Sequence, residues 1–205
     1  PDSAEMRILQ AQVLRVKRPR EAEMVLIESL KLHPEIAELQ DELGLTYVVM
    51  GKTLDALEAF ERALRLRPNF AEAHFHLGST LREMGRTQKA IDAFFKAIDA
   101  DGTVIRYHMD LAATFAARGE MERALASYRQ ALRLDPDSAV ATCKIGEALV
   151  LIMGDHAKNL GRGVEWLVKC LELQPDHPEA NKWLGHAYRQ LGERAQAKAA
   201  YVAHL

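Results

Sequence analysis

An excess of either charge is missing from this sequence, and so are long hydrophobic runs. The chain has 27 basic and 29 acidic residues, which gives a net charge of −2. An extended phosphate-binding surface normally leaves a basic excess, so we expect no nucleic-acid partner. No apolar stretch comes near the length of about 18 residues that a membrane-spanning helix needs, so we expect no membrane contact.

Cysteine is scarce, with only Cys143 and Cys170. Two cysteines are too few for a disulfide framework, and their scarcity fits a reducing compartment, so the cytoplasm is the expected location. The sequence has no Cys-x-x-Cys, His-Glu-x-x-His or EF-hand spacing, so we predict neither a metal site nor a cofactor. Because the chain begins with Pro1, we interpret it as a processed product or as part of a longer protein.

Signals for β-structure are also weak. Aromatic residues make up 6% of the chain, and no long run alternates Val, Ile and Thr with polar residues. The most abundant residues are instead Ala, Leu, Glu, Arg and Lys, which favour helices. The composition therefore predicts an all-α protein.

What the sequence does contain is an internal repeat of 34 residues, which indicates a stacked repeat architecture. The interval is visible in three sets of residues: Leu43, Leu77 and Leu111; Ala56, Ala90 and Ala124; and Phe60, Phe94 and Tyr128. Between Leu149 and Gly163 the spacing slips once, by five residues. We therefore predict a single domain of about six units: 3–36, 37–70, 71–104, 105–138, 139–177 with the insertion, and a truncated 178–205.

Each unit has the pattern of two helices joined by a short turn. In the second unit the apolar periodicity predicts helices over Ala37–Met50 and Thr53–Leu66. Gly51 separates the two helices, and Pro68 ends the second. One hairpin cannot bury its own apolar face, so the units must stack.

Two local features lead to further expectations. Asn69 with Glu72, and Asp176 with Glu179, have the spacing of capping boxes at helix starts. The glycine-rich segment 154–163 is expected to form a longer hairpin turn, and it offers a second contact surface.

The repeated residues closely resemble the tetratricopeptide repeat (TPR) family. The second unit carries the pattern as Leu43-Gly44, Tyr47, Ala56, Phe60, Ala63 and Pro68, and the sixth as Leu184-Gly185, Tyr188, Gly192, Ala197 and Tyr201. The resemblance implies a right-handed α-solenoid of stacked helical hairpins, whose first helices line a concave groove. Members of this family usually bind peptides or protein segments there.

The repeat phase then predicts which residues face this groove. The predicted contact residues are Glu38, Asp41, Glu42, Glu72, Phe75, His76, Met109, Asp110, Lys144, Lys182, Trp183 and Arg189. The acids of the second and third units form an expected acidic patch, with Phe75 and Met109 as exposed apolar anchors. Our hypothesis is a non-catalytic scaffold that binds a basic stretch of a partner protein.

The ligand cannot be named from the better-known groove types of the family. The chaperone-tail clamp needs Lys and Asn where this chain has Arg7, Ala11 and Glu42, and the asparagine ladder of the sugar-transferase superhelix is also missing. Two alternatives stay open. In one alternative to the scaffold, the chain is the substrate-recruiting or regulatory arm of a larger enzyme such as a transferase. In the other, it is a module that self-associates through its terminal repeats.

Overall fold

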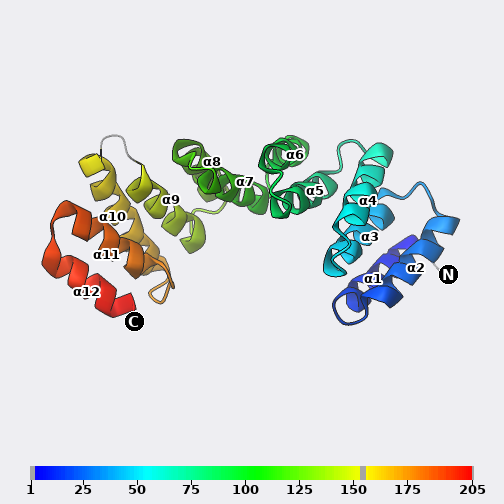
Figure 1. Ribbon diagram of the computed structural model, residues 1–205, viewed down its shortest axis with the longest axis horizontal. Coiled ribbons are helices and arrows are strands. Elements are labelled where there is room, and N and C mark those ends of the chain that lie inside the picture. The colour runs from blue at the N-terminus through cyan, green and yellow to red at the C-terminus, as the bar shows by residue number, and fades with distance from the viewer. Residues whose placement is uncertain (1–2, 153–155, 205) are drawn as a thin grey trace. The chain divides into compact units, whose positions relative to one another are not determined.

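The computed structural model describes residues 3–152 and 156–204. Their regular secondary structure consists of twelve α-helices, which confirms the prediction of an all-α helical-repeat protein (Figure 1). The chain forms two compact units, Pro1–Gly102 and Thr103–Leu205. None of the described helices combines the length and apolar character that crossing a membrane requires.

The first compact unit, Pro1–Gly102, contains three consecutive helical hairpins. Its helices are α1 (Ala4–Lys17), α2 (Pro19–Leu32), α3 (Ala37–Val49), α4 (Thr53–Leu66), α5 (Ala71–Glu83) and α6 (Thr87–Ala100). Each helix packs against the next one in the chain, and the first helices also contact each other, α1 with α3 and α3 with α5. This is the stacking that the repeat predicts.

The second compact unit, Thr103–Leu205, repeats the arrangement. Its helices are α7 (Ile105–Ala117), α8 (Met121–Leu134), α9 (Ala139–Leu151), α10 (His156–Leu173), α11 (Ala180–Leu191) and α12 (Arg194–His204). Here too each helix packs against the next, and α9 also contacts α11. One cluster of its core lies among α9, α10, α11 and α12, around residues such as Leu167 and Leu184.

The second hairpin shows why the helices begin and end where they do. On α4, Ala56, Phe60 and Ala63 are fully buried, at the spacing of one helix face. The chain leaves α3 through Gly51, whose φ of 71° is accessible to glycine at no steric cost. The predicted bounds of α4 are confirmed, whereas α3 ends at Val49, one residue before the predicted end.

The predicted capping boxes are wrong. The N-cap residues are Phe70 for α5 and Glu179 for α11, and neither side chain caps its helix. Phe70 is buried, so packing of the ring, rather than a hydrogen bond from Asn69, fixes the start of α5. A side-chain cap occurs instead at Ser138, which accepts a hydrogen bond from the Ala141 amide at 3.4 Å.

The predicted hairpin turn over 154–163 is also largely wrong. Residues 156–163 belong to α10, the longest described helix, with 18 residues. The extra residues therefore extend the second helix of the fifth hairpin at its N-terminal end. The remaining part of the expected turn, residues 154–155, lies outside the described residues.

Candidate functional site

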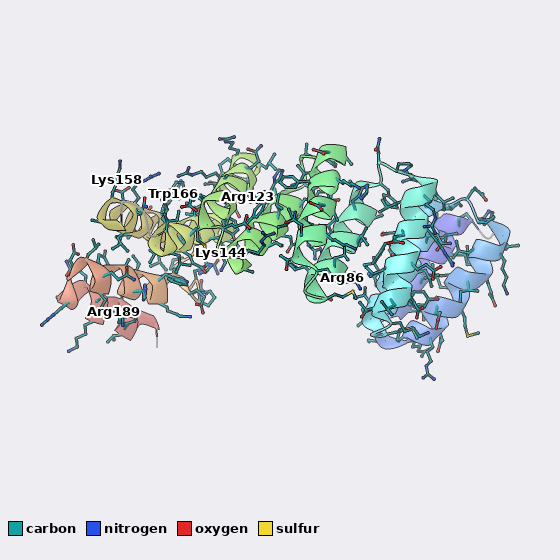
Figure 2. The ribbon with its side chains drawn as sticks, turned by 45° about the horizontal axis from the view of Figure 1, so that its top comes forward. Arg86, Arg123, Lys144, Lys158, Trp166 and Arg189 are labelled. Atoms are coloured by element: carbon teal, nitrogen blue, oxygen red, sulfur yellow. The ribbon has the colours of Figure 1, made fainter. Side chains whose placement is uncertain are left out.

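Helices α7, α8, α9 and α11 of the second compact unit line a pocket of about 390 Å³. Lys144 of α9 (labelled in Figure 2) and Trp183 of α11 both line it. The structure thus brings two of the predicted groove residues together. The complete lining is Ala113, Ala116, Ala117, Met121, Tyr128, Lys144, Glu147, Ala148, Leu151 and Trp183.

The pocket combines an apolar lining with one charged pair. Lys144 Nζ donates a hydrogen bond to Glu147 Oε2 at 2.7 Å, and both side chains remain partly exposed. Tyr128 is buried, and this burial, together with the charges of Glu147 and Asp110, raises its pKa to about 12. The phenol is therefore neutral at physiological pH. Small side chains on α7, such as the exposed Ala113, leave the space open.

The other predicted groove residues of this unit do not line the pocket. Met109, Asp110, Lys182 and Arg189 lie elsewhere, and Arg189 projects from α11 (Figure 2). Lys182 Nζ donates to Glu179 Oε2 at 2.7 Å, so its charge is already neutralised within its own helical turn. A role for these four in binding stays a prediction.

The prediction of Phe75, in the third repeat, as an exposed apolar anchor is wrong. Phe75 is only 3% exposed. Its ring centroid lies 5.7 Å from those of Phe94 and His76, so the side chain packs against the second helix of its own hairpin. The repeat phase gives the direction in which a residue leaves its helix, but a large ring can still fold back into the core.

The predicted acidic patch is partly buried and ion-paired. Asp41 and Glu42 are only 7% and 4% exposed. Arg15 and Gln12 of α1 donate hydrogen bonds to Glu42, and His76 Nδ1 lies 2.9 Å from Asp41 Oδ1. These two acids are therefore not available to a basic partner, because Arg15 pairs with Glu42 and the His76 ring contacts Asp41.

Two acids of the predicted patch remain at the surface. Glu72 is exposed, and the partly exposed Glu38 accepts a hydrogen bond from Arg67. Burial opposes the ionisation of Glu38, but hydrogen bonds from Arg67 and from the backbone outweigh it and lower the pKa. For Glu42 the balance is reversed: burial outweighs the attraction of Arg15 and raises the pKa. The electrostatics of this face therefore differ from one acid to the next.

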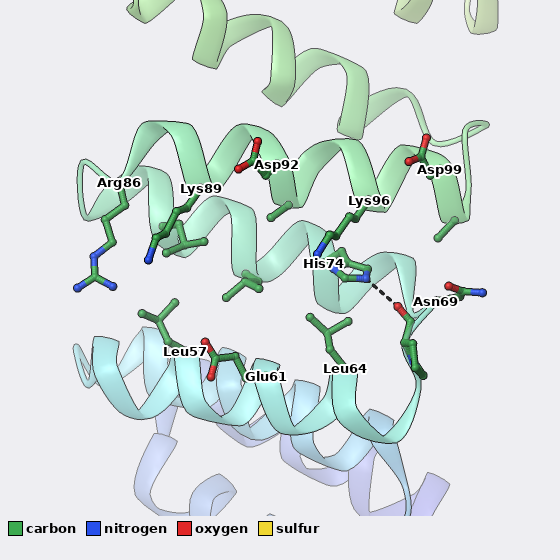
Figure 3. A pocket seen from close by; sticks show the side chains of 15 residues that line it. Leu57, Glu61, Leu64, Asn69, His74, Arg86, Lys89, Asp92, Lys96 and Asp99 are labelled. Atoms are coloured by element: carbon green, nitrogen blue, oxygen red, sulfur yellow. Dashed lines mark hydrogen bonds between the residues drawn. The ribbon is translucent and has the colours of Figure 1, made fainter.

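A larger cleft of about 800 Å³ lies between α4 and α6, and residues of α5 form its floor (Figure 3). The sequence does not predict this cleft, because the groove expected from the repeat phase lies on the face of the first helices. Its apolar surface includes Leu57 and Leu64 of α4 and Leu77 and Leu81 of α5. The signal in the sequence that could have indicated it is a set of basic residues on the second helix of the third hairpin.

Those basic residues are Arg86, Lys89 and Lys96, whose side chains are exposed. Figure 3 shows all three reaching from the α6 side of the cleft toward α4. Within residues 3–152 and 156–204, none of them forms an ion pair. One wall of the cleft therefore carries three cations with no anionic partner.

The carboxylates of the same lining are placed differently. Asp92 and Asp99 also belong to α6, but in Figure 3 they point away from α4. Glu61 of α4 is the one acid that Figure 3 shows inside the cleft. The cleft between the two helices is therefore more positive than a count of its lining residues suggests.

His74 closes the deep side of this cleft. Its Nε2–H donates a hydrogen bond to the Pro68 carbonyl at 2.8 Å (Figure 3), and Nδ1 is buried with no partner among the described residues. Burial lowers the pKa of His74 against the effect of this hydrogen bond, and the nearby charge of Lys96 lowers it further. The imidazole is therefore neutral at pH 7.

Comparison with protein families agrees with the repeat pattern. Tetratricopeptide repeat families match residues 42–104, 112–151 and 179–203, and so cover parts of both units. The chain belongs to the tetratricopeptide repeat family. The predicted family is thereby confirmed, from the second repeat (37–70) to the sixth.

Solved TPR structures resemble this chain over most of its length. YrrB, described as a TPR protein with an unusual peptide-binding site, is 19% identical, with a TM-score of 0.73 over 87% of this chain and 90% of YrrB. A MamA structure is 26% identical, with a TM-score of 0.71 over 81% and 95%. PilF of Pseudomonas aeruginosa is 14% identical, with a TM-score of 0.79 over 97% and 88%. No curated protein sequence matches the chain.

The TPR chain also exposes apolar side chains at its first hairpin. Met6, Leu9, Val13 and Val16 on α1 are between 57% and 80% exposed. Their spacing places them along one side of the helix. This face is the structural feature to examine for the predicted self-association through the terminal repeats, which stays a prediction.

Proposed function

We propose that this TPR chain is a non-catalytic scaffold that binds a segment of a partner protein on the face formed by α7, α9 and α11. The observation that carries the proposal is the pocket of about 390 Å³ that contains Lys144 and Trp183. Binding pockets for small groups typically have volumes of about 300–1,000 Å³ and a mostly apolar lining with a few polar groups. Membership of a family of interaction modules supports the same function.

The lining determines which partner group fits. Trp183 and Leu151 offer apolar surface, and the alanines of α7 leave room for an inserted side chain. The Lys144–Glu147 pair at this surface can bind polar backbone groups of a partner without adding net charge. We therefore expect a segment anchored by one large apolar side chain, with Trp183 as the strongest contributor to affinity.

The test is a selection of peptides from a random library on the whole chain, followed by measurement of Kd for a selected peptide. Ala113→Arg places a long side chain in the pocket, whereas Ala126→Arg places the same side chain on an exposed alanine of α8 outside it. We expect Ala113→Arg and Trp183→Ala each to weaken binding at least about tenfold, and Ala126→Arg to leave Kd unchanged.

Circular dichroism and the melting temperature must first show that all three variants are folded. Equal Kd values for Ala113→Arg and Ala126→Arg would contradict binding in the pocket. Selected peptides that bind all variants equally would show that the chain is a scaffold that uses another surface.

A second candidate surface is the α4–α6 cleft, which we propose for an acidic amphipathic segment. Arg86, Lys89 and Lys96 would face its carboxylates, and leucines of α4 and α5 would contact its apolar side. Charge complementarity of this kind increases association rates and is screened by salt.

The substitutions at this cleft have opposite expected effects. The double substitution Lys89→Glu with Lys96→Glu should lower the affinity for an acidic helical peptide by at least about tenfold and reduce the salt dependence of binding. Glu61→Gln removes the one acid that faces the cations and should strengthen binding. Fluorescence anisotropy at several salt concentrations measures both. Weaker binding by Glu61→Gln would exclude this orientation.

The alternative that the chain is the recruiting or regulatory arm of a larger enzyme needs no different surface. In that case the bound segment belongs to the substrate of a catalytic domain elsewhere in the protein. The full length of the native open reading frame discriminates between the two. An adjoining domain with a catalytic site would favour the recruiting arm.

A further inference from the structure

Two buried cysteines and a histidine meet in the fifth hairpin. Cys143 lies on α9, Cys170 on α10 and His177 in the connection from α10 to α11. One ligand atom from each, the two Sγ atoms and a ring nitrogen, lies within 4.8 Å of the others. Cys143 Sγ is 3.4 Å from His177 Nδ1. Sequence spacing could not indicate this cluster, because its members are 27 and 7 residues apart.

The repeat provides an internal comparison for these three positions. Positions equivalent to Cys170 hold Ala63, Ala97 and Ala131, and those equivalent to His177 hold Phe70, Val104 and Ser138. Positions equivalent to Cys143 hold Asp41, Phe75 and Met109. Packing at these sites therefore requires neither sulfur nor imidazole. Only the fifth unit has metal-ligand side chains at all three positions at once.

The donor set has the chemistry of a site for a thiophilic cation. Two thiolates and one imidazole suit Zn²⁺, with Zn–S bonds of about 2.3 Å and Zn–N bonds of about 2.0–2.1 Å. These bonds place tetrahedral ligand atoms about 3.5–3.8 Å apart. Closing the cluster from within 4.8 Å requires small side-chain rotations and no new backbone path.

Charge and access are also favourable. Cys143 and Cys170 are 3% and 0% exposed, so an uncompensated ion there would be costly. On binding, the two S–H protons leave for solvent, and two thiolates with one divalent cation carry no net charge. His177 is only partly buried, which gives an entry route and a place for a water as the fourth ligand.

We propose that Cys143, Cys170 and His177 form a binding site for Zn²⁺. The ion ties α9, α10 and the α10–α11 connection together beside the long α10. It takes the lone pair of His177 Nδ1, whose contacts within the described part of the chain are two long ones at 3.4 Å, to Cys143 Sγ and the Glu179 amide. Binding therefore breaks no strong hydrogen bond, and the site acts as a structural link within the second unit.

The test uses the whole chain without a histidine tag, reduced with a phosphine and freed of metal. Zn²⁺ is titrated against a chromophoric chelator, and Co²⁺ serves as a spectroscopic substitute. We expect one equivalent of each metal to bind, a sulfur-to-cobalt charge-transfer band, and a melting temperature that rises with Zn²⁺.

Variants taken from the repeat itself supply the controls. Cys170→Ala and His177→Ser restore residues found in other units, so we expect both to fold, with Zn²⁺ affinity at least about tenfold lower. His33→Ala removes a histidine outside the cluster and should change nothing. The proposal is overturned if the reduced native chain binds no stoichiometric metal, or if Cys170→Ala keeps the affinity and the charge-transfer band. A chain that only forms a Cys143–Cys170 disulfide in air, and binds no metal when reduced, overturns it equally.

Discussion

A Cβ atom added to Gly44 would lie 2.5 Å from Cε1 of Phe60. The ring is fully buried, so α3 and α4 meet through a residue without a side chain on one helix and a ring on the other. The same contact occurs in the next hairpin, where a Cβ on Gly78 would lie 2.8 Å from the Phe94 ring. The small and large residues of the repeat are therefore a matched pair.

We expect Gly44→Ala to destabilise the protein because the methyl group overpacks this contact. Overpacking costs about 1–3 kcal/mol, and the better helix propensity of alanine offsets about 1 kcal/mol. The net free energy of unfolding should fall by up to about 2 kcal/mol, measured by urea denaturation.

The matched variant is Phe60→Leu. In the first repeat, Leu26 occupies the position of Phe60, and Gln10 occupies the position of Gly44. In the double variant Gly44→Ala with Phe60→Leu, leucine leaves room for the methyl group. The double variant should therefore lose less stability than the sum of the losses of the two single variants. Purely additive losses would show that the helices adjust elsewhere and that Gly44 and Phe60 are not coupled.

The sequence was sufficient to predict the helical hairpins. The predicted bounds of α4 are confirmed because its buried face, the Gly51 turn and Pro68 are all local signals. The insertion was misread because Gly161 and Gly163 suggested a turn, yet both lie within α10. Close packing against Val150 of α9 accounts for Gly163, where an added Cβ would lie 2.8 Å from Val150, but it does not account for Gly161, whose surroundings are open.

The candidate sites were less predictable because they depend on pairs from different helices. Lys144 and Trp183, both predicted for the groove, share a pocket, and their role in binding stays a prediction. The burial of Glu42 depends on Arg15, 27 residues earlier, and the repeat phase contains no information about such a pair. The α4–α6 cleft requires knowledge of how two second helices are spaced, which no single repeat provides.

We expect Arg15→Met to destabilise the protein more than the loss of an ordinary surface ion pair. The side chain of Glu42 is 5% exposed, and among the described residues the Gln12 amide is the side-chain donor that remains to its carboxylate without Arg15. Leaving a buried polar group without its partner costs about 1–3 kcal/mol, and more when the group is charged. The free energy of unfolding at pH 7 measures the effect.

Arg62→Met is the control, since it breaks an exposed pair with Glu58 at the i, i+4 spacing. That loss should be at most about 0.5 kcal/mol. Adding Glu42→Gln to Arg15→Met should recover part of the stability by removing the buried charge. Equal losses for Arg15→Met and Arg62→Met would contradict the burial argument.

Tyr128 should make stability sensitive to alkaline pH. Its pKa is about 12 in the folded protein, above the reference value of 10.0, so the folded state holds the phenolic proton more tightly than the unfolded state. The stabilising contribution is complete below pH 10 and is lost as the pH rises toward 12. The stability of Tyr128→Phe should therefore fall less steeply than that of the native chain between pH 10 and 12. Parallel curves would show that the phenol is more accessible to solvent than its burial indicates.

His74 should make stability sensitive to acid, with the opposite sign. Burial lowers its pKa below the reference value of 6.5, so on acidification the unfolded chain takes up the proton first. Stability then falls as the pH drops through 6.5, because the folded state resists protonation of His74.

The substitution that isolates this effect is His74→Gln, which places at this position the residue of the preceding unit, Gln40. The free energy of unfolding should be measured for both chains from pH 8 to pH 5. His186, whose pKa burial and Arg189 also lower, is present in both chains, so its contribution cancels in the difference. We expect the native chain to lose more stability than His74→Gln over this range. An identical loss in the two chains would contradict the prediction, because it would mean that neither burial nor Lys96 opposes the protonation of His74.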